Sequence, residues 1–526
     1  MDPVKVTING QEVITEKGKT VIQAAADAGI AIPHYCYHPK LSIAGNCRMC
    51  LVEIEKMPKL QIACNTLATE GMSVLTQSPK VLAVRKAVME FLLVNHPVDC
   101  PICDQAGECW LQDYYMQHDR EPSRFDERKE HDRKREIFGP NVVFDGERCI
   151  KCTRCVRFLQ EVTHTNELNV VNRGDHSTIA LFPGTVLDNP LSANVVDICP
   201  VGALTDRDFR FKVRVWYLQK TSSICPGCST GCNVSVETYQ NRIARFKPRI
   251  NESVNSHWLC DEGRYCFHDL AAGERLTTPM IRQEGGLVPT SWENALRAVI
   301  NGLGSATPVA GILSGRNTNE EAYLFAKLMR KVSPDSALEV FYQERELTEV
   351  EKILISPDRS PNFRGIRDMG VTSNAGFDFL MRELLSGYLR GAFIVGEDLT
   401  QLDGDQIRSA LEKLSFLVVQ DTRLTETAKL AHVVLPSAHF GEKEGTYTNR
   451  KGRVQKLDTA TIPPEGTLID SEIFLGLLEL TGEKPPYRSA REIFAAIAHD
   501  IPGYSGLTYE AIGALGTQVT EPAKQP

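Results

Sequence analysis

Sixteen cysteines, all between Cys36 and Cys266, restrict the structures open to this 526-residue chain. Most of them fall in groups with the spacing C-x2-C, and no cysteine follows Cys266. A disulfide-stabilised secreted protein is usually small and distributes its cysteine pairs along its whole length. The distribution seen here therefore favours metal or iron-sulfur binding in a reducing compartment over a disulfide scaffold.

The densest group is the segment 96–109, which contains one histidine and three cysteines. Cys100, Cys103 and Cys109 have the spacing C-x2-C-x5-C, which suits one [4Fe-4S] cluster. His96 stands four residues upstream, where it can supply the fourth ligand, and an apolar pattern over residues 81–95 predicts a helix leading into it. Three cysteines and one histidine are also a common structural zinc set, so this segment alone leaves zinc open.

An earlier group has the spacing C-x10-C-x2-C-x13-C, with the tight central pair and distant outer ligands of a plant-type [2Fe-2S] loop. Its first gap is longer than the usual x4, and zinc remains an alternative here too. Upstream, the alternating residues 4–8 and the Asn9-Gly10 turn predict a hairpin, and a helix is expected between Thr20 and Gly29. The four ligands predicted for this [2Fe-2S] cluster are Cys36, Cys47, Cys50 and Cys64.

Two further groups predict two more [4Fe-4S] clusters. The run C-x2-C-x2-C is typical of such a cube, and a remote Cys-Pro completes the first set. The first set is Cys149, Cys152, Cys155 and Cys199, and the second is Cys225, Cys228, Cys232 and Cys260. The four sets together use fifteen of the sixteen cysteines, which predicts about 14 irons per chain. Cys266 is left over, and we expect it to be an inert buried thiol.

After about residue 270 the pattern changes to alternating strands and helices, which predicts a largely parallel sheet. Strands are expected at residues 308–314, 392–395 and 416–419. Thr290-x-x-Glu293 and Thr318-x-x-Glu321 each predict a capping box at the start of a helix.

Composition excludes several classes of function. The net charge of -8 and the pI near 5.9 give no electrostatic reason to expect nucleic acid or an anionic membrane surface as a partner. The N-terminus lacks the pattern of a signal peptide, and no apolar run is long enough to span a bilayer. We therefore expect any membrane association to occur through partner proteins.

With its ligands in this order, the chain resembles the family of large iron-sulfur subunits (G subunits) of NADH-quinone oxidoreductases, the enzymes also called respiratory complex I. The resemblance spans nearly the whole chain, and the set that begins with His96 is its most specific part. A later motif resembles the molybdopterin oxidoreductase fold that forms the C-terminal part of these subunits. It reads Leu435-Pro436, then Glu442-x-Glu-Gly445-Thr446-x-Thr-Asn449-x-x-Gly452-Arg453-Val454-Gln455.

The resemblance implies a multidomain chain that combines α+β and α/β folds. An N-terminal β-grasp [2Fe-2S] ferredoxin-like domain would be followed by [4Fe-4S]-binding domains and a truncated molybdopterin oxidoreductase-like α/β domain. The expected boundaries are 1–80 for the [2Fe-2S] domain, 81–140 for the His/Cys3 [4Fe-4S] domain, 141–217 for a ferredoxin-like [4Fe-4S] domain, 218–275 for a [4Fe-4S] domain of molybdopterin oxidoreductase type, 276–515 for the α/β domain and 516–526 for a disordered tail.

The function that the resemblance implies is electron transfer inside a larger enzyme, proton-translocating NADH:quinone oxidoreductase. The chain would carry electrons from the NADH/FMN module toward quinone and would have no catalytic residue of its own. Its expected partners are the flavin- and NADH-binding subunit, the small [2Fe-2S] subunit, the subunit with two [4Fe-4S] clusters and the quinone-module subunits, without nucleic acid. The expected location is peripheral, on the cytoplasmic side of the bacterial inner membrane.

Two departures from the molybdenum enzymes predict that no molybdenum or pterin is bound. The chain ends about seventy residues after the Gly452-Arg453 motif, and Glu262 stands where those enzymes have lysine. The alternative functions are the α subunit of an NAD-linked formate dehydrogenase or a hydrogenase, and a non-redox zinc scaffold. A formate dehydrogenase would need a Cys or selenocysteine ligand downstream of Cys260, and a hydrogenase would need further cysteines after the fourth set; no cysteine follows Cys266.

Overall fold

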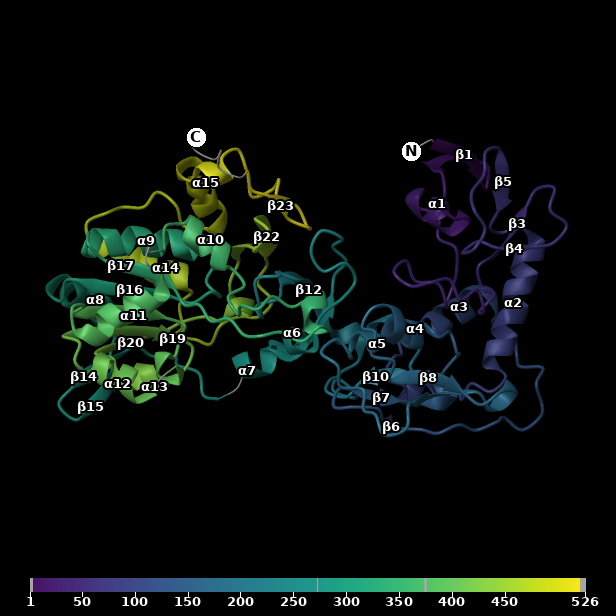
Figure 1. Ribbon diagram of the computed structural model, residues 1–526, viewed down its shortest axis with the longest axis horizontal. Helices are drawn as coiled ribbons and strands as arrows, with labels where there is room; N and C mark the ends of the chain where they lie inside the picture. Colours follow the sequence, from purple (N-terminus) through teal and green to yellow (C-terminus); the bar gives the residue numbers. More distant parts are fainter. Residues whose placement is uncertain (1–2, 272, 373–375, 403, 521–526) are drawn as a thin grey trace. The chain divides into compact units, whose positions relative to one another are not determined.

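The computed structural model describes residues 3–271, 273–372, 376–402 and 404–520 (Figure 1). The chain divides into two compact units, Met1–Leu218 and Gln219–Pro526. In the described parts of the chain, no helix has the length and apolar character needed to cross a bilayer.

The first unit begins with a mixed five-stranded sheet in the order β2-β1-β5-β3-β4. Its elements are β1 (Pro3–Ile8), β2 (Gln11–Glu16), α1 (Val21–Asp27), β3 (Leu51–Ile54), β4 (Gln61–Ile62) and β5 (Met72–Leu75). The predicted hairpin is confirmed: β1 and β2 pair antiparallel across Asn9 and Gly10, which both have positive φ, as a tight two-residue turn requires. Apolar residues of α1 pack on the sheet in one core with Cys50 and Cys64, which confirms the β-grasp fold.

The rest of this unit consists of short elements that carry the next two cysteine sets. The helix expected at 81–95 is α2, which spans Pro79–Leu93 and is capped by Ser78. A three-stranded sheet here has the order β10-β7-β6, and β8 pairs with β9. The elements after α2 are η1 (Cys100–Ile102), α3 (Trp110–His118), β6 (Glu136–Ile137), β7 (Val142–Phe144), η2 (Gly146–Arg148), α4 (Arg154–Glu161), β8 (Leu168–Val171), η3 (Gly174–His176), β9 (Thr178–Leu181), α5 (Asn194–Ile198), β10 (Leu204–Asp206) and η4 (Val215–Tyr217).

The second unit opens with the antiparallel sheet β11-β12-β13 and continues into a seven-stranded sheet in the order β15-β14-β20-β19-β18-β16-β17. The elements up to the middle of the large sheet are β11 (Gln219–Ile224), β12 (Asn233–Tyr239), β13 (Arg242–Pro248), α6 (Asp261–Tyr265), α7 (Phe267–Ala271), β14 (Met280–Gln283), β15 (Gly286–Pro289), α8 (Trp292–Ser305), β16 (Val309–Leu313), α9 (Asn319–Val332), β17 (Ala337–Val340) and η5 (Glu351–Ile353). The strands from β17 across the sheet to β20 pair in parallel, as the sequence predicts.

The remaining elements complete that sheet and add a small C-terminal one in the order β21-β22-β23. They are α10 (Phe363–Asp368), α11 (Phe377–Ser386), β18 (Gly391–Val395), η6 (Leu399–Gln401), α12 (Gly404–Glu412), β19 (Phe416–Asp421), α13 (Glu426–Leu430), β20 (Val433–Pro436), η7 (Phe440–Glu442), β21 (Gly445–Thr448), β22 (Arg453–Leu457), α14 (Asp470–Leu480), α15 (Ala490–Asp500), η8 (Pro502–Tyr504) and β23 (Thr517–Gln518).

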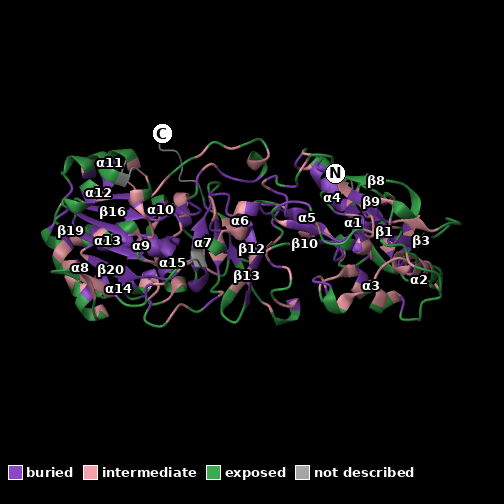
Figure 2. Cartoon of the chain, turned by 90° about the horizontal axis from the view of Figure 1, so that it is seen from below, coloured by how far each residue is buried: buried purple, intermediate pink, exposed green. Residues whose placement is uncertain are grey.

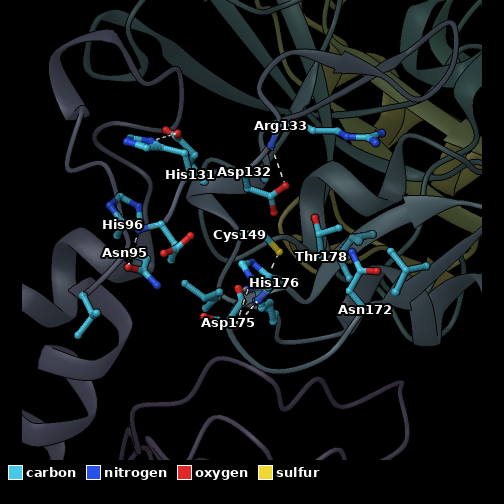
Figure 3. A pocket seen from close by; sticks show the side chains of 18 of the residues that line it. Asn95, His96, His131, Asp132, Arg133, Cys149, Asn172, Asp175, His176 and Thr178 are labelled. Carbon is cyan, nitrogen blue, oxygen red and sulfur yellow. Dashed lines mark hydrogen bonds and ion pairs between the residues drawn. The ribbon is translucent and has the colours of Figure 1, made fainter. Parts of the chain in front are cut away.

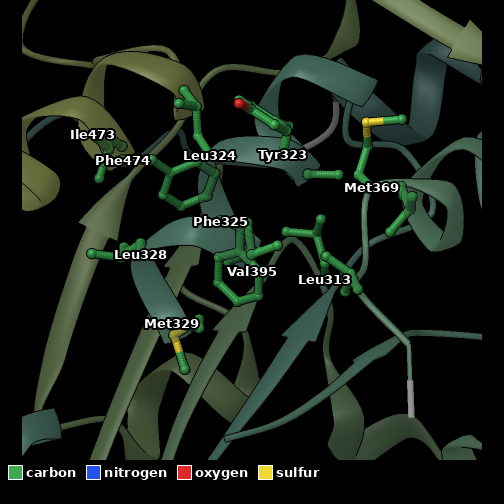
Figure 4. Packing of buried hydrophobic residues seen from close by; sticks show 14 of the residues in the cluster. Leu313, Tyr323, Leu324, Phe325, Leu328, Met329, Met369, Val395, Ile473 and Phe474 are labelled. Carbon is green, nitrogen blue, oxygen red and sulfur yellow. The ribbon is translucent and has the colours of Figure 1, made fainter. Parts of the chain in front are cut away.

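The large sheet is covered on both faces, which explains why its parallel strands are mostly apolar. Along β18, Phe393 and Val395 belong to one core with α8, α9, α14 and α15, whereas Ala392 and Ile394 belong to the core with α11, α12 and α13. Figure 2 shows β16 and β20 of this sheet as buried residues. In the first core the Phe325 ring contacts Phe393 and Phe474, at centroid distances of 5.5 and 5.4 Å, and those two rings are 6.2 Å apart. Figure 4 shows Phe325 and Phe474 in this cluster.

Two sequence predictions about this unit need correction. Helix α8 begins at Trp292, and its cap is Ser291, whose hydroxyl accepts from the Asn294 amide; Thr290 is one residue too early to cap it. The predicted capping box of Thr318 and Glu321 is present. The disordered tail was placed too early, because Thr517–Gln518 form β23, which pairs with β22; residues 521–526 lie outside the described residues.

A buried ionic network holds the C-terminal motif against α9 and α14. The Lys443 ammonium contacts Glu321 at 2.9 Å and Asp470 at 2.8 Å. Next to it, the Glu320 carboxylate accepts hydrogen bonds from the Thr446 amide at 2.8 Å and from its hydroxyl at 2.9 Å. Lys443 is shared by two carboxylates, whereas Glu320 has no cation beside it among the described residues. Burial raises the pKa of Glu320 to about 8.

We expect Glu320→Gln to stabilise the protein more at pH 8 than at pH 5. Because the folded-state pKa is about 8 and the ordinary value is 4.5, the wild-type carboxyl contributes fully below pH 4.5 and loses its contribution as the pH rises toward 8. Glutamine cannot ionise, so the gain in the free energy of unfolding should be on the order of a few kcal/mol larger at pH 8. Urea denaturation at the two pH values measures it, with the exposed Glu293→Gln as control. If the variant and the wild type differed in free energy of unfolding by the same amount at both pH values, titration of the buried Glu320 carboxyl would be contradicted.

Candidate iron-sulfur sites

The first cysteine set lies in the loops next to β3 and β4. The Cys36 amide donates to the Cys47 sulfur at 3.4 Å, and side-chain hydrogen bonds pair Cys36 with Cys47 and Cys50 with Cys64. These bonds lower the pKa of Cys36 and Cys64 and raise the pKa of their partners. The Cys36 thiol also interacts electrostatically with Cys50 and Cys64. The structure therefore brings all four thiols together.

The third set surrounds a small cavity. Cys155 lies in the first turn of α4, and Cys199 directly follows α5. Lys151 and Thr153 adopt positive φ between the cysteines, and the Lys151 amide donates to the Cys149 sulfur at 3.4 Å. The four thiols that line the cavity are Cys149, Cys152, Cys155 and Cys199.

The fourth set surrounds a small cavity. Its loop is closed by the Cys225 amide, which donates to the Cys232 carbonyl at 2.8 Å. Two sulfurs accept from backbone: Cys260 from the Gly263 amide at 3.3 Å and Cys228 from the Ser356 amide at 3.5 Å. The four thiols that line the cavity are Cys225, Cys228, Cys232 and Cys260.

The chemistry of these donor sets fits iron-sulfur clusters. Burial raises the pKa of seven of the eight thiols in the third and fourth sets, to about 12 for Cys199. The hydrogen bond with Cys266, followed by burial, raises the pKa of Cys225. Four buried thiolates facing one cavity would repel one another, and a cationic iron core offsets both the repulsion and the lost hydration. Within the described ranges, no three His, Cys, Asp or Glu groups are arranged around a single metal ion. Ligands of a cube bind its separate irons instead of one shared ion.

The three thiols of the second set lie near one another. Cys100 and Cys103 lie in or beside η1, Cys109 precedes α3, and the three thiols interact electrostatically. Burial raises the pKa of Cys109 to about 11. The Cys103 sulfur lies so close to Gly202 that a β-carbon at position 202 would be 2.3 Å from it. The second set therefore packs against the loop that follows Cys199.

The His96 ring forms a hydrogen bond with its own loop. Its Nδ1 accepts a hydrogen bond from the Val98 amide at 3.0 Å, and burial lowers the pKa of His96 to about 4, so the ring is neutral at pH 7. Figure 3 shows the ring at the wall of a cavity that Asn95 and Cys149 also line. No contact among the described residues joins His96 to Cys100, Cys103 or Cys109. With Nδ1 as acceptor, Nε2 carries the proton, so binding iron through Nε2 requires the opposite tautomer.

Several residues of these sites were not predicted from the sequence. Cys266 is partly exposed instead of buried, and its thiol forms a hydrogen bond with Cys225. Glu262, expected only as a replacement for lysine, forms ion pairs with Arg345 at 3.0 Å and with Arg359 beside the fourth cavity. Both arginines lie far along the chain, and no local pattern marks them.

Comparison with known proteins gives the family. Five family models match in chain order: the 2Fe-2S iron-sulfur cluster binding domain at residues 1–79, the NADH-ubiquinone oxidoreductase-G iron-sulfur binding region at 85–124, the ferredoxin-like domain of NADH-quinone oxidoreductase subunit 3 at 139–205, the molybdopterin oxidoreductase Fe4S4 domain at 218–270 and molybdopterin oxidoreductase at 275–348 and 349–480. The mitochondrial 78 kDa subunit of NADH-ubiquinone oxidoreductase from Neurospora crassa is 33% identical over 93% of this chain and 82% of that protein. The chain belongs to the family of NADH-quinone oxidoreductase G subunits.

Other relatives match less of their own length. The G subunit of NADH-quinone oxidoreductase from Rickettsia felis is 40% identical over 63% of this chain and 50% of that protein. The chain thus spans about half the length of the curated Rickettsia relatives that it matches. A chain from a solved NAD+-reducing [NiFe]-hydrogenase is 32% identical over 40% of this chain and 91% of that chain, with a TM-score of 0.37.

Replacing Gly202 by alanine should remove the iron held by the Cys103 set, because the new β-carbon would displace the Cys103 sulfur. We expect the iron content to fall by about four per chain, the content of one cube. Gly304→Ala is the matched control, because nothing lies within 4 Å of a β-carbon there. Unchanged iron in Gly202→Ala would show that the thiol and its loop can move aside.

Proposed function

We propose that this chain is the iron-sulfur electron-transfer subunit of an NADH-quinone oxidoreductase and relays electrons from an NADH/FMN module toward quinone. The observation that carries the proposal is the convergence of buried thiols, separated in sequence, on shared cavities such as the one lined by the Cys149 set. The family and its iron-sulfur domain models support the same function. The partners would be the flavin, small [2Fe-2S], two-[4Fe-4S] and quinone-module subunits.

In this function the chain binds and shields redox centres and performs no chemistry on a substrate. Iron-sulfur clusters, when bound, supply reversible one-electron transfer. The chain supplies thiolates, backbone amides that donate to sulfur, such as those of Lys151 and Gly263, and low exposure to water. Amide donors and burial both adjust the reduction potential of a cluster. The chain would lie on the cytoplasmic side of a bacterial inner membrane and reach it only through partners.

The proposed complement is one [2Fe-2S] cluster and three [4Fe-4S] clusters, without molybdenum. Loss of the pterin role is supported by the motif after β21, whose polar groups serve the backbone. Asn449 donates to the Thr230 carbonyl at 3.1 Å and accepts from the Arg453 amide at 3.0 Å, and Arg453 donates to the Gly516 carbonyl at 2.7 Å. Gly452, at φ +77°, makes the turn between them. The C-terminal domain would therefore act as a scaffold.

Metal analysis of the full chain purified without oxygen should give about 14 irons and matching sulfide, with neither molybdenum nor tungsten. A value near ten would mean that one cube is unfilled, and the Cys225 set is the one we expect to be affected. If the count is near 14, Cys228→Ala should remove a single EPR signal. Near-stoichiometric molybdenum with formate-dependent reduction would replace this proposal by the formate dehydrogenase alternative, and zinc without iron would replace it by the zinc scaffold.

His96 is proposed as the fourth ligand of the second set, bound through a neutral imidazole. Because the ring must first give up its bond from Val98, binding is expected to couple a change of tautomer to cluster insertion. His96→Ala should abolish or alter the EPR signal of that cube, and His96→Cys should restore a cube with a changed potential. His499→Ala, at an exposed position on α15, is the control. An unaltered spectrum in His96→Ala would mean that the histidine only packs.

A further inference from the structure

The loop between Cys36 and Cys47 is attached to helix α4, whose N-terminal turn carries Cys155. This is the loop whose length exceeds the usual plant-type spacing. The Ser42 amide donates to the Glu161 carboxylate at 2.7 Å, and the Asn46 side chain donates to the Lys151 carbonyl at 3.1 Å. The additional residues therefore give the first cysteine set a direct attachment to the third.

Arg157 of α4 stands at the centre of this attachment and is 7% exposed. Its Nη2 donates both to the Cys36 carbonyl at 2.6 Å and to the Cys152 carbonyl at 3.2 Å, so one nitrogen joins ligand residues of two sets. Its Nη1 donates to the Ser42 carbonyl. A planar guanidinium can make these bonds together because its donors point in fixed, divergent directions.

Arg154, one turn earlier on the same helix and 2% exposed, repeats the pattern. It donates to the Ile198 carbonyl, next to Cys199, at 3.1 Å and to the Tyr37 carbonyl, next to Cys36. Its guanidinium lies over the Trp110 ring, 4.6 Å from the centroid. Both arginines thus link the same two loops.

Neither guanidinium is within ion-pair distance of a carboxylate in the part of the chain that the structure describes. The charges that act on Arg154 with opposite sign are the thiols Cys152, Cys199 and Cys36. A buried cation without a partner is expensive, whereas the thiolates of two cluster sites would supply its counter-charge. The positions of the two guanidinium groups therefore suit the state in which both sites hold their clusters.

We propose that Arg157, supported by Arg154, is a positioning residue that joins the first and third cluster sites and holds a positive charge between them. This inference rests on the proposed function. The charge favours the more negative, reduced state of either cluster, so it raises both potentials together. The hydrogen bonds fix the spacing of the two loops and make a continuous connection through one guanidinium.

The test is an EPR-monitored redox titration of the full chain. In Arg157→Gln, the ratio of reduced to oxidised protein at a fixed ambient potential should fall by about tenfold at both clusters. Arg157→Lys keeps the charge and should shift each ratio much less, although it loses the planar fork. Arg173→Gln, at an exposed position in the same unit, should change neither. The magnetic interaction between the two reduced clusters should weaken in Arg157→Gln as the loops separate.

A shift at only one cluster, or at neither, would overturn the inference while leaving the proposed function intact. A wild-type chain without iron would instead remove the proposed function itself. If Arg157→Gln does not retain iron, Arg157→Lys decides. A lysine variant with both clusters at nearly wild-type potentials supports the shared charge. A lysine variant in which both potentials are clearly lower than in the wild type contradicts it, because lysine carries the same charge.

Discussion

Buried thiols without a counter-charge are the constraint on which the first unit and the start of the second depend. A thiol in the protein interior resists ionisation because its thiolate loses hydration, and every neighbouring thiolate adds repulsion. The loops around the Cys149 and Cys225 sets keep these thiols buried close to one another. Backbone amides and left-handed residues such as Thr153 restrict the conformations that these loops can adopt. Such loops are stable around a cationic core and poorly stabilised without one, so binding and folding are linked.

Much of the fold could be predicted because its causes are local. The Asn9-Gly10 turn, the cap at Thr318 and the apolar strands of the large sheet depend on residues within a few positions of one another. The spacing of the cysteines is largely local as well. In three of the four sets predicted from that spacing, the structure brings the thiols together. The cap of α8 at Ser291 was missed by one residue, because two adjacent hydroxyl residues offer the same signal.

What could not be predicted depends on contacts between distant residues. Arg157 and Cys36 are 121 positions apart, and Arg345 and Glu262 are 83 apart, so neither pair leaves a local pattern. His96 shows another limit: spacing identifies a candidate ligand, whereas the ring orientation depends on the Val98 amide and on burial. The sequence prediction ended the C-terminal fold before β23 for the same reason: β23 forms only through its pairing with β22.

The contact between Gly202 and the Cys103 sulfur has an evolutionary consequence. Gly202 does not have the positive φ that usually preserves a glycine; it is held by the absence of space for one carbon atom. Any lineage that keeps Cys103 in place must therefore keep the smallest residue at a position 99 residues away, within the loop of a different cysteine set. The segments around Cys103 and Gly202 therefore cannot change independently. If either segment is exchanged for that of a relative, the other must be exchanged with it.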